Sequence, residues 1–159
     1  MSAAELSAQV VGEAVELLFD TALGMSVSDV QPGMPEARDE DRVTAAVAVQ
    51  GAWGGHVVLS CGRRLAEHMS ARFLAAAGVD DPPSAQDTLD ALGELANILA
   101  GQLKSSLPGP TTLGAPRVTG LGGTSYFARG AEPRVTLSCR VGQGLAVVQV
   151  LERVGRARG

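Results

Sequence analysis

The chain has 159 residues, 45% of them hydrophobic, and a formal net charge of −4 at pH 7. A chain of this length can bury one core of its own, so we expect a single domain over residues 1–159, with its folded core at about 10–151. Lysine and arginine are scattered along an acidic chain, which argues against nucleic acid and anionic membranes as partners and favours a basic protein surface.

The N-terminus predicts neither export nor membrane insertion. Residues 1–5 lack the basic and apolar segments of a signal peptide. The chain also has no uninterrupted apolar run near the roughly 20 residues that span a bilayer. We therefore expect a cytoplasmic protein.

The first half of the chain is predicted to form a helix and a β-hairpin. Apolar residues recur at helical spacing from about Ala4 to Leu23, and Gly24 is a typical helix end. A loop over residues 31–42 follows. Residues 43–49 and 56–60 then flank a glycine-rich turn, which predicts two paired strands.

Two further helices are predicted in the middle of the chain. Residues 64–77 return to helical spacing, and Gly78 ends that segment. Ser84 precedes Asp87 by three residues, the arrangement of a capping box at a helix start. The helix that Ser84 opens is expected to stop at Leu107, because Pro108 follows it.

The chain closes with a second predicted hairpin, whose strands are residues 135–141 and 145–151, after a loop rich in glycine and threonine. The order helix, hairpin, helix, helix, hairpin predicts an α+β fold with an antiparallel sheet packed against long helices. A small sheet leaves unpaired strand edges, and pairing across a twofold axis would cover them. We therefore expect a homodimer.

A weak internal repeat suggests that each half of the chain is one helix plus one hairpin. Residues 42–44 (Arg-Val-Thr) recur as residues 134–136, each at a predicted strand. On this interpretation residues 16–19 correspond to residues 94–97, and Phe19 stands in the first helix where the second has a carboxamide. The alternative is a chance likeness between two halves built from common strand residues.

The helix after Ser84 carries polar residues on one face. Asp90, Glu94, Asn97 and Gly101 are spaced three or four residues apart, so they share that face. An apolar stripe on the other side is predicted to be buried, and its members are Leu89, Leu92, Ala96, Leu99 and Leu103. Asparagine inside a helix costs a few tenths of a kcal/mol relative to alanine, and capping does not explain it here. The polar face is either a binding surface or an ordinary solvated one.

Other common chemistries find no support in the residues. Cys61 and Cys139 are expected to be buried and apolar in character, as thiols in a cytosolic protein usually are. His56 and His68 lack metal-ligand spacing to either cysteine, so no metal site is predicted. The chain also lacks a phosphate-binding Gly-x-x-x-x-Gly-Lys loop and a Gly-x-Ser-x-Gly nucleophile motif.

On the residues of its polar helix, the chain resembles the chemotaxis phosphatase family that includes CheX, CheC and FliY. The family motif is Asp or Ser, three residues, Glu, two residues and Asn, and Asp90, Glu94 and Asn97 fit it in register. The surrounding run, residues 93–101, is also similar to the family.

The likeness extends over about residues 10–150 and is greatest to the CheX branch. Residues 15–19 and 51–55 resemble that branch upstream of the motif. Downstream, residues 116–120 resemble the continuation of the motif, with Pro116 as its proline, at a shorter distance from Asn97 than the family pattern implies. A CheX-like chain is expected to carry one site.

The resemblance implies hydrolysis of the aspartyl phosphate on a phosphorylated CheY-like response regulator. Asn97 would then hold the attacking water, because a carboxamide both donates and accepts hydrogen bonds. Glu94 would pair with the regulator's lysine, Asp90 would support docking, and Gly101 would permit close approach. The protein would need no cofactor of its own, since magnesium belongs to the regulator. The resemblance implies a homodimer as well.

Two other functions remain open from the sequence. A non-catalytic module could recognise a response regulator, or a signalling or flagellar protein, with the same helix. A small-molecule sensor could use a pocket between the two halves, although no group of residues in the sequence points to its ligand.

Overall fold

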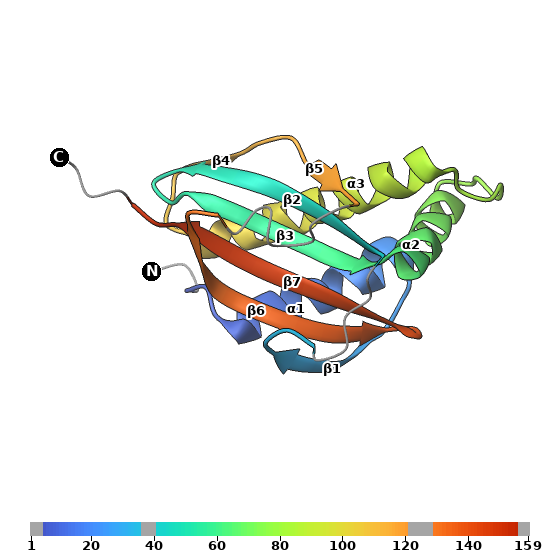
Figure 1. Cartoon of the computed structure of the whole chain (residues 1–159), viewed down its shortest axis with the longest axis horizontal. Coiled ribbons are helices and arrows are strands. Elements are labelled where there is room, and N and C mark those ends of the chain that lie inside the picture. Colours follow the sequence, from blue (N-terminus) through green and yellow to red (C-terminus); the bar gives the residue numbers. More distant parts are fainter. Residues whose placement is uncertain (1–4, 36–40, 121–128, 156–159) are drawn as a thin grey trace.

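The computed structural model describes residues 5–35, 41–120 and 129–155. These residues form an α+β fold in which helices pack on a seven-stranded antiparallel sheet, as predicted (Figure 1). The strands are β1 (Val27–Pro32), β2 (Arg42–Gly51), β3 (Gly55–Gly62), β4 (Thr111–Leu113), β5 (Arg117–Thr119), β6 (Ala131–Val141) and β7 (Gly144–Arg153).

Helix α1 (Ala8–Leu18) confirms the first predicted helix. Ser7 caps its start by accepting a hydrogen bond from the backbone N–H of Val10. The helix continues as a π-helical turn (Phe19–Leu23) and ends at Gly24, whose positive φ of 61° is a conformation that glycine adopts without a Cβ penalty.

Helices α2 (Arg63–Ala76) and α3 (Ala85–Leu103) also lie where the sequence predicts them. The capping box of α3 is formed: the N–H of Asp87 donates to the Ser84 hydroxyl at 3.0 Å, and the N–H of Ser84 donates to the Asp87 carboxylate at 2.9 Å. The α-helix ends at Leu103, before the predicted Leu107, because the chain tightens into a 3₁₀ turn (Lys104–Ser106).

The two predicted hairpins lie side by side at the centre of the sheet. The strand order is β1-β6-β7-β3-β2-β4, with β5 also paired to β2. Strands β1, β4 and β5 extend beyond the predicted hairpins, and β4 and β5 occupy a segment that the sequence predicts to be a loop. Each of these short strands pairs with the outer strand of a hairpin distant in sequence, β6 or β2.

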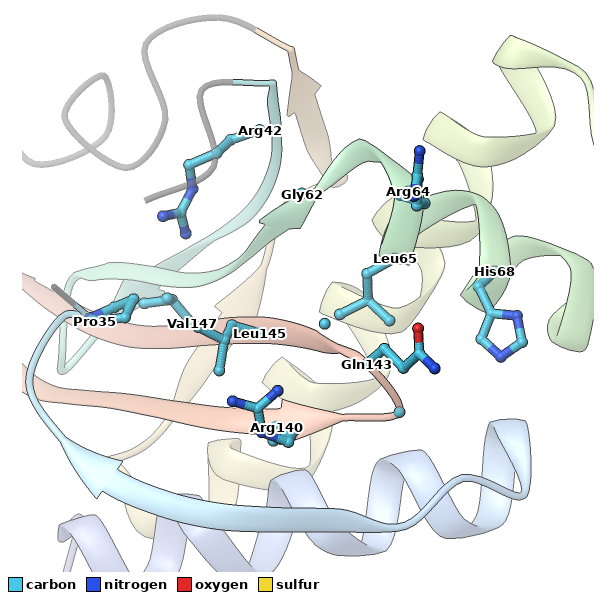
Figure 2. Close-up of a pocket in the computed structure, with 12 residues that line it drawn as sticks. Pro35, Arg42, Gly62, Arg64, Leu65, His68, Arg140, Gln143, Leu145 and Val147 are labelled. Atoms are coloured by element: carbon cyan, nitrogen blue, oxygen red, sulfur yellow. The ribbon is translucent and has the colours of Figure 1, made fainter. Parts of the chain in front are cut away.

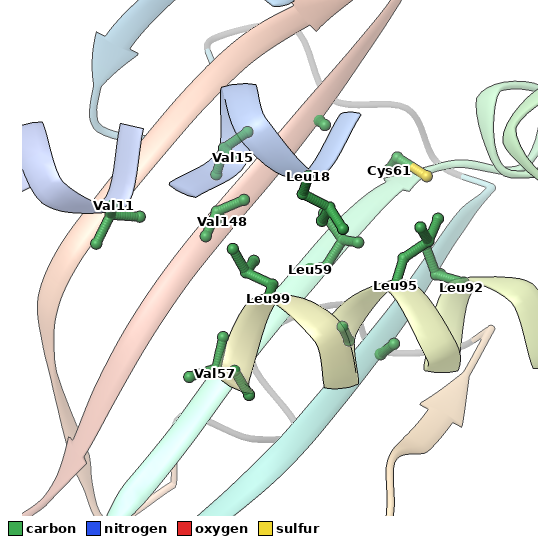
Figure 3. Packing of buried hydrophobic residues seen from close by; sticks show 14 of the residues in the cluster. Val11, Val15, Leu18, Val57, Leu59, Cys61, Leu92, Leu95, Leu99 and Val148 are labelled. Carbon is green, nitrogen blue, oxygen red and sulfur yellow. The ribbon is translucent and has the colours of Figure 1, made fainter. Parts of the chain in front are cut away.

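Helices α1 and α3 cover one face of the sheet, and α2 lies at one end of it (Figure 1). The main core lies between that face and the helices (Figure 3). Val11, Leu18, Leu59, Leu95 and Leu99 are among its fully buried side chains. The cysteines are buried and free, as expected.

The same structure bears on membranes and on self-association. Within the described ranges, no helix has both the length and the apolar composition needed to span a membrane. Among the strands that the structure describes, β1 and β4 stand at the two ends of the sheet order. The homodimer expected from such edges stays a prediction.

Candidate functional site

Helix α3 presents the polar face predicted from its sequence. Asp90, Glu94 and Gly101 are exposed and Asn97 is half-buried, while most of the predicted apolar stripe is buried in the core. Leu89 is the exception, because it is only partly buried and lies beside the polar face. The helix therefore brings the four predicted residues together along about three turns.

Glu94 and Asn97 have no polar partner within the part of the chain that the structure describes. Neither side chain makes a hydrogen bond or an ion pair there, although Asn97 is half-buried. Asp90 is held differently, since its carboxylate accepts a hydrogen bond of 2.8 Å from the Gln86 side chain one turn earlier. The carboxylate of Glu94 and the carboxamide of Asn97 are thus available to a molecule that docks on this helix.

A groove runs between α3 and the segment that contains β5. Its volume is about 490 Å³. Its described lining includes two carboxylates and no basic side chain, and these residues are Gln86, Leu89, Asp90, Gly93, Glu94, Pro116 and Val118. A groove of this composition favours a cationic group on its partner.

Gly93 explains how β5 comes so close to the helix. A Cβ built on Gly93 would lie 3.2 Å from a methyl group of Val118 and 3.4 Å from the Cβ of Pro116. The missing side chain therefore lets the proline segment rest against α3, one turn before Asn97. The sequence predicts a role for Pro116 but not this role of Gly93, whose only signal is a glycine inside a helix beside the motif.

Gly101 differs from Gly93 because no atom lies within 4 Å of a Cβ built on it, the backbone of its own helix aside. The fold of the described residues therefore does not require glycine at this position. Glycine in a helix interior is destabilising by about 0.5–1 kcal/mol relative to alanine. A residue that weakens the helix and relieves no contact in the chain suits a surface that a partner approaches.

The first helix carries a related but different set of residues. Aligning α1 with α3 by their buried positions pairs Gly12 with Gly93, Glu13 with Glu94 and Glu16 with Asn97. This register differs by three residues from the one that the sequence suggests. Phe19 is fully buried and so cannot share the exposed face. Helix α1 still lacks the carboxamide, with a glutamate in its place.

The remaining titratable candidates lie away from this face. Burial, and secondarily the charge of Glu16, raise the pKa of the Cys139 thiol to about 11, so this thiol stays protonated at neutral pH. Burial, followed by the charges of Arg153 and Arg117, lowers the pKa of His56. Over residues 5–35, 41–120 and 129–155, no group of three or more His, Cys, Asp or Glu side chains could hold a metal ion.

Solved structures share this fold. CheX from Vibrio vulnificus matches with a TM-score of 0.70 at 16% identity, covering 91% of this chain and 95% of that one. CheX from Desulfovibrio desulfuricans matches with a TM-score of 0.66 at 19% identity, covering 92% and 98%. A CheX–CheY–BeF₃–Mg²⁺ complex from Borrelia burgdorferi matches with a TM-score of 0.68 at 13% identity, covering 91% and 96%.

At the level of sequence, no curated protein matches the chain. The family model described as chemotaxis phosphatase CheX matches residues 43–140, a span that includes α3, nearly all of the first hairpin and strand β6 of the second. The chain therefore belongs to the CheX family of chemotaxis phosphatases.

Proposed function

We propose that this protein hydrolyses the aspartyl phosphate of a CheY-like response regulator, and that α3 is the helix that docks on the regulator. The observation that carries the proposal is the pair Glu94 and Asn97, which have no polar partner among the described residues and share one face of α3 in a member of the CheX family. The Borrelia burgdorferi structure, a CheX–CheY complex with BeF₃ and Mg²⁺, supports a regulator of this class as the partner.

Asn97 is proposed to position the attacking water. An acyl phosphate is already activated, and the regulator brings its own magnesium and lysine, so the enzyme needs no cofactor of its own. What remains is to hold water in line with the phosphorus, which a carboxamide does by accepting one hydrogen bond and donating another. Holding a reactant in the attack geometry can contribute several kcal/mol to lowering the barrier.

Glu94 is proposed to bind the lysine of the regulator rather than its phosphoryl group, because a carboxylate would repel the phosphoryl oxygens. The groove supports this assignment, since the charged side chains in its described lining, Asp90 and Glu94, are acidic. Asp90 adds attraction at the edge of the contact. Gly101 has no side chain, so the regulator can pack close to the helix backbone at this position.

The proposal is tested by following phosphate release from a phosphorylated CheY-like regulator with Mg²⁺. Asn97→Ala is expected to lower kcat about 100-fold, the loss typical of a misplaced reactant, with little change in KM. Gln9→Ala is the matched control, because it removes an exposed carboxamide from α1. Equal rates for the wild type and Asn97→Ala would refute the assignment.

Glu94→Gln separates docking from chemistry. Removing the charge while keeping the shape is expected to raise KM more than it lowers kcat, and to weaken the dependence of binding on salt. Glu13→Gln on α1 is the matched control for the loss of one exposed carboxylate. Tight binding of the regulator by the wild type without faster dephosphorylation would favour the non-catalytic binding module instead.

A further inference from the structure

A cavity of about 740 Å³ lies on the face of the sheet opposite α1 and α3, at the end where β3 runs into α2 (Figure 2). The strand side chains that line it are Arg42, Arg140, Leu145 and Val147. Each neighbours a residue that points into the core, so these four belong to the other face of the sheet. The cavity is thus separated from the groove beside α3 by the sheet itself.

The hollow has a simple origin in strand register. Arg42 pairs with Gly62 on β3, and Leu145 on β7 pairs with Arg140 on β6. Because Cys61 pairs with Ala146, Gly62 and Leu145 are the next neighbours across the centre of the sheet. Two arginines therefore stand three strand spacings apart, about 14 Å. Leu145 and Gly62 lie between them, and Gly62 has no side chain to fill the space.

The lining of the cavity is basic in an otherwise acidic chain. Arg42, Arg64, Arg140 and His68 all line it, and among the lining residues that the structure describes none is a carboxylate. One of these side chains has an acidic partner, since Arg140 pairs with Asp29 at 3.6 Å. Both side chains of that pair are about half exposed or more, so the pair contributes little and can exchange for a ligand.

Two of the arginines differ in how they are held. Arg42 is anchored, because its Nε and Nη2 donate to the buried hydroxyl of Ser60 at 3.2 and 3.0 Å, and that hydroxyl lies 2.9 Å from the Thr44 hydroxyl. Arg64, in the first turn of α2, makes no hydrogen bond or ion pair within the described ranges. Gly62, the N-cap of α2, supplies no side-chain cap to that helix.

We propose that this cavity binds a small phosphorylated metabolite of about the size of a mononucleotide. Guanidinium groups recognise phosphate through paired N–H donors, and the start of α2 adds a further favourable field for an anion. Leu65, Leu145 and Val147 offer an apolar floor for the rest of the molecule (Figure 2). The volume falls within the range typical of small-molecule sites.

The proposal is independent of the phosphatase function. The groove beside α3 is acidic and would repel the same ligand, so the two sites select opposite charges. Binding of a metabolite here is measured on the purified chain without a response regulator. A negative result for metabolite binding in the cavity would therefore not contradict the phosphatase function, and the reverse also holds.

The test is calorimetric titration of the full chain with ADP, with adenosine and inorganic phosphate as partial ligands. ADP is expected to bind one per chain, and more tightly than either fragment. Arg64→Gln and Gln143→Glu are each expected to weaken ADP binding at least tenfold. The second change places a carboxylate on the exposed turn at the rim of the cavity, where the fold tolerates it.

Matched controls make the same changes elsewhere. Arg134 lies toward the other end of β6 from Arg140, and Gln50 lies at the end of β2 far from Arg42. Arg134→Gln and Gln50→Glu are each expected to change the affinity for ADP less than twofold. The proposal is overturned if ADP does not bind at millimolar concentration, if adenosine binds as tightly as ADP, or if the controls weaken binding as much as the cavity variants. Thermal unfolding of each variant verifies that it folds.

Discussion

Replacing Gly101 with alanine should make the protein more stable and a poorer partner. Leaving out the backbone of the same helix, no atom of the described residues lies within 4 Å of the Cβ that the substitution adds, so the new methyl group meets no neighbour among them. The substitution removes the conformational freedom of glycine from the unfolded chain. We expect a gain of about 0.4–1 kcal/mol in the free energy of unfolding.

A gain of this size corresponds to a rise in Tm of roughly 1–4 °C for a chain of this length. Urea denaturation followed by circular dichroism measures the free energy directly. The response regulator should bind the variant about tenfold more weakly, because a methyl group forced into a close contact costs about 1–3 kcal/mol. Binding is measured by titration of the regulator in its phosphorylated state.

Gly93→Ala is the control for Gly101→Ala, because it adds the same methyl group to the same helix at a crowded position. Its Cβ would lie 3.2 Å from Val118, so the segment around Pro116 must move away from the helix. We expect Gly93→Ala to be less stable than Gly101→Ala by at least 1 kcal/mol, the usual scale of overpacking. If Gly101→Ala lowers the free energy of unfolding, or leaves binding of the regulator unchanged, then the proposal that the regulator packs against Gly101 is refuted.

Three further outcomes follow from local features of the structure. Ser84→Ala should lower the free energy of unfolding by about 1 kcal/mol in urea titrations, because it breaks the capping box of α3; no loss would contradict that role. Cys139 should resist iodoacetamide at pH 8 and react only after unfolding, since its pKa is raised to about 11 and it is buried. His56 has a lowered pKa in the fold, so the unfolded chain takes up the proton first as the pH falls. The free energy of unfolding should therefore decrease as the pH falls below about 6.5. In His56→Gln this slope should flatten, as measured by denaturation midpoints at pH 5.5 and 7.5; an unchanged slope would assign it to other groups.

Much of the architecture follows from patterns that are local in sequence. The capping box at Ser84, the glycine at the end of α1 and the apolar spacing within α3 each act over a few residues, so they predict where the helices lie. The same holds for the polar face. Asp90, Glu94, Asn97 and Gly101 share one side of α3 because helical geometry alone puts them there.

Contacts between distant segments decided what these patterns could not. Strands β4 and β5 are three residues each, too short for a periodic signal, and they exist because β2 offers them an edge to pair with. The alignment of α1 with α3 in the internal repeat also depends on which residues are buried. The spacing predicts that Phe19 corresponds to Asn97, but Phe19 is buried in the core and corresponds to Ala100 when the buried positions of the two helices are aligned.

The sequence by itself determined the helix, its polar face and the kind of chemistry that a carboxylate and a carboxamide can perform. Only the tertiary structure decided which glycine serves the fold and which is open to a partner, because that depends on what lies beside Gly93 and Gly101 in space. It also brought Arg42 and Arg140, nearly a hundred residues apart, to either side of one cavity. Helix periodicity acts within a few residues, whereas strand pairing joins any two segments whose edges fit.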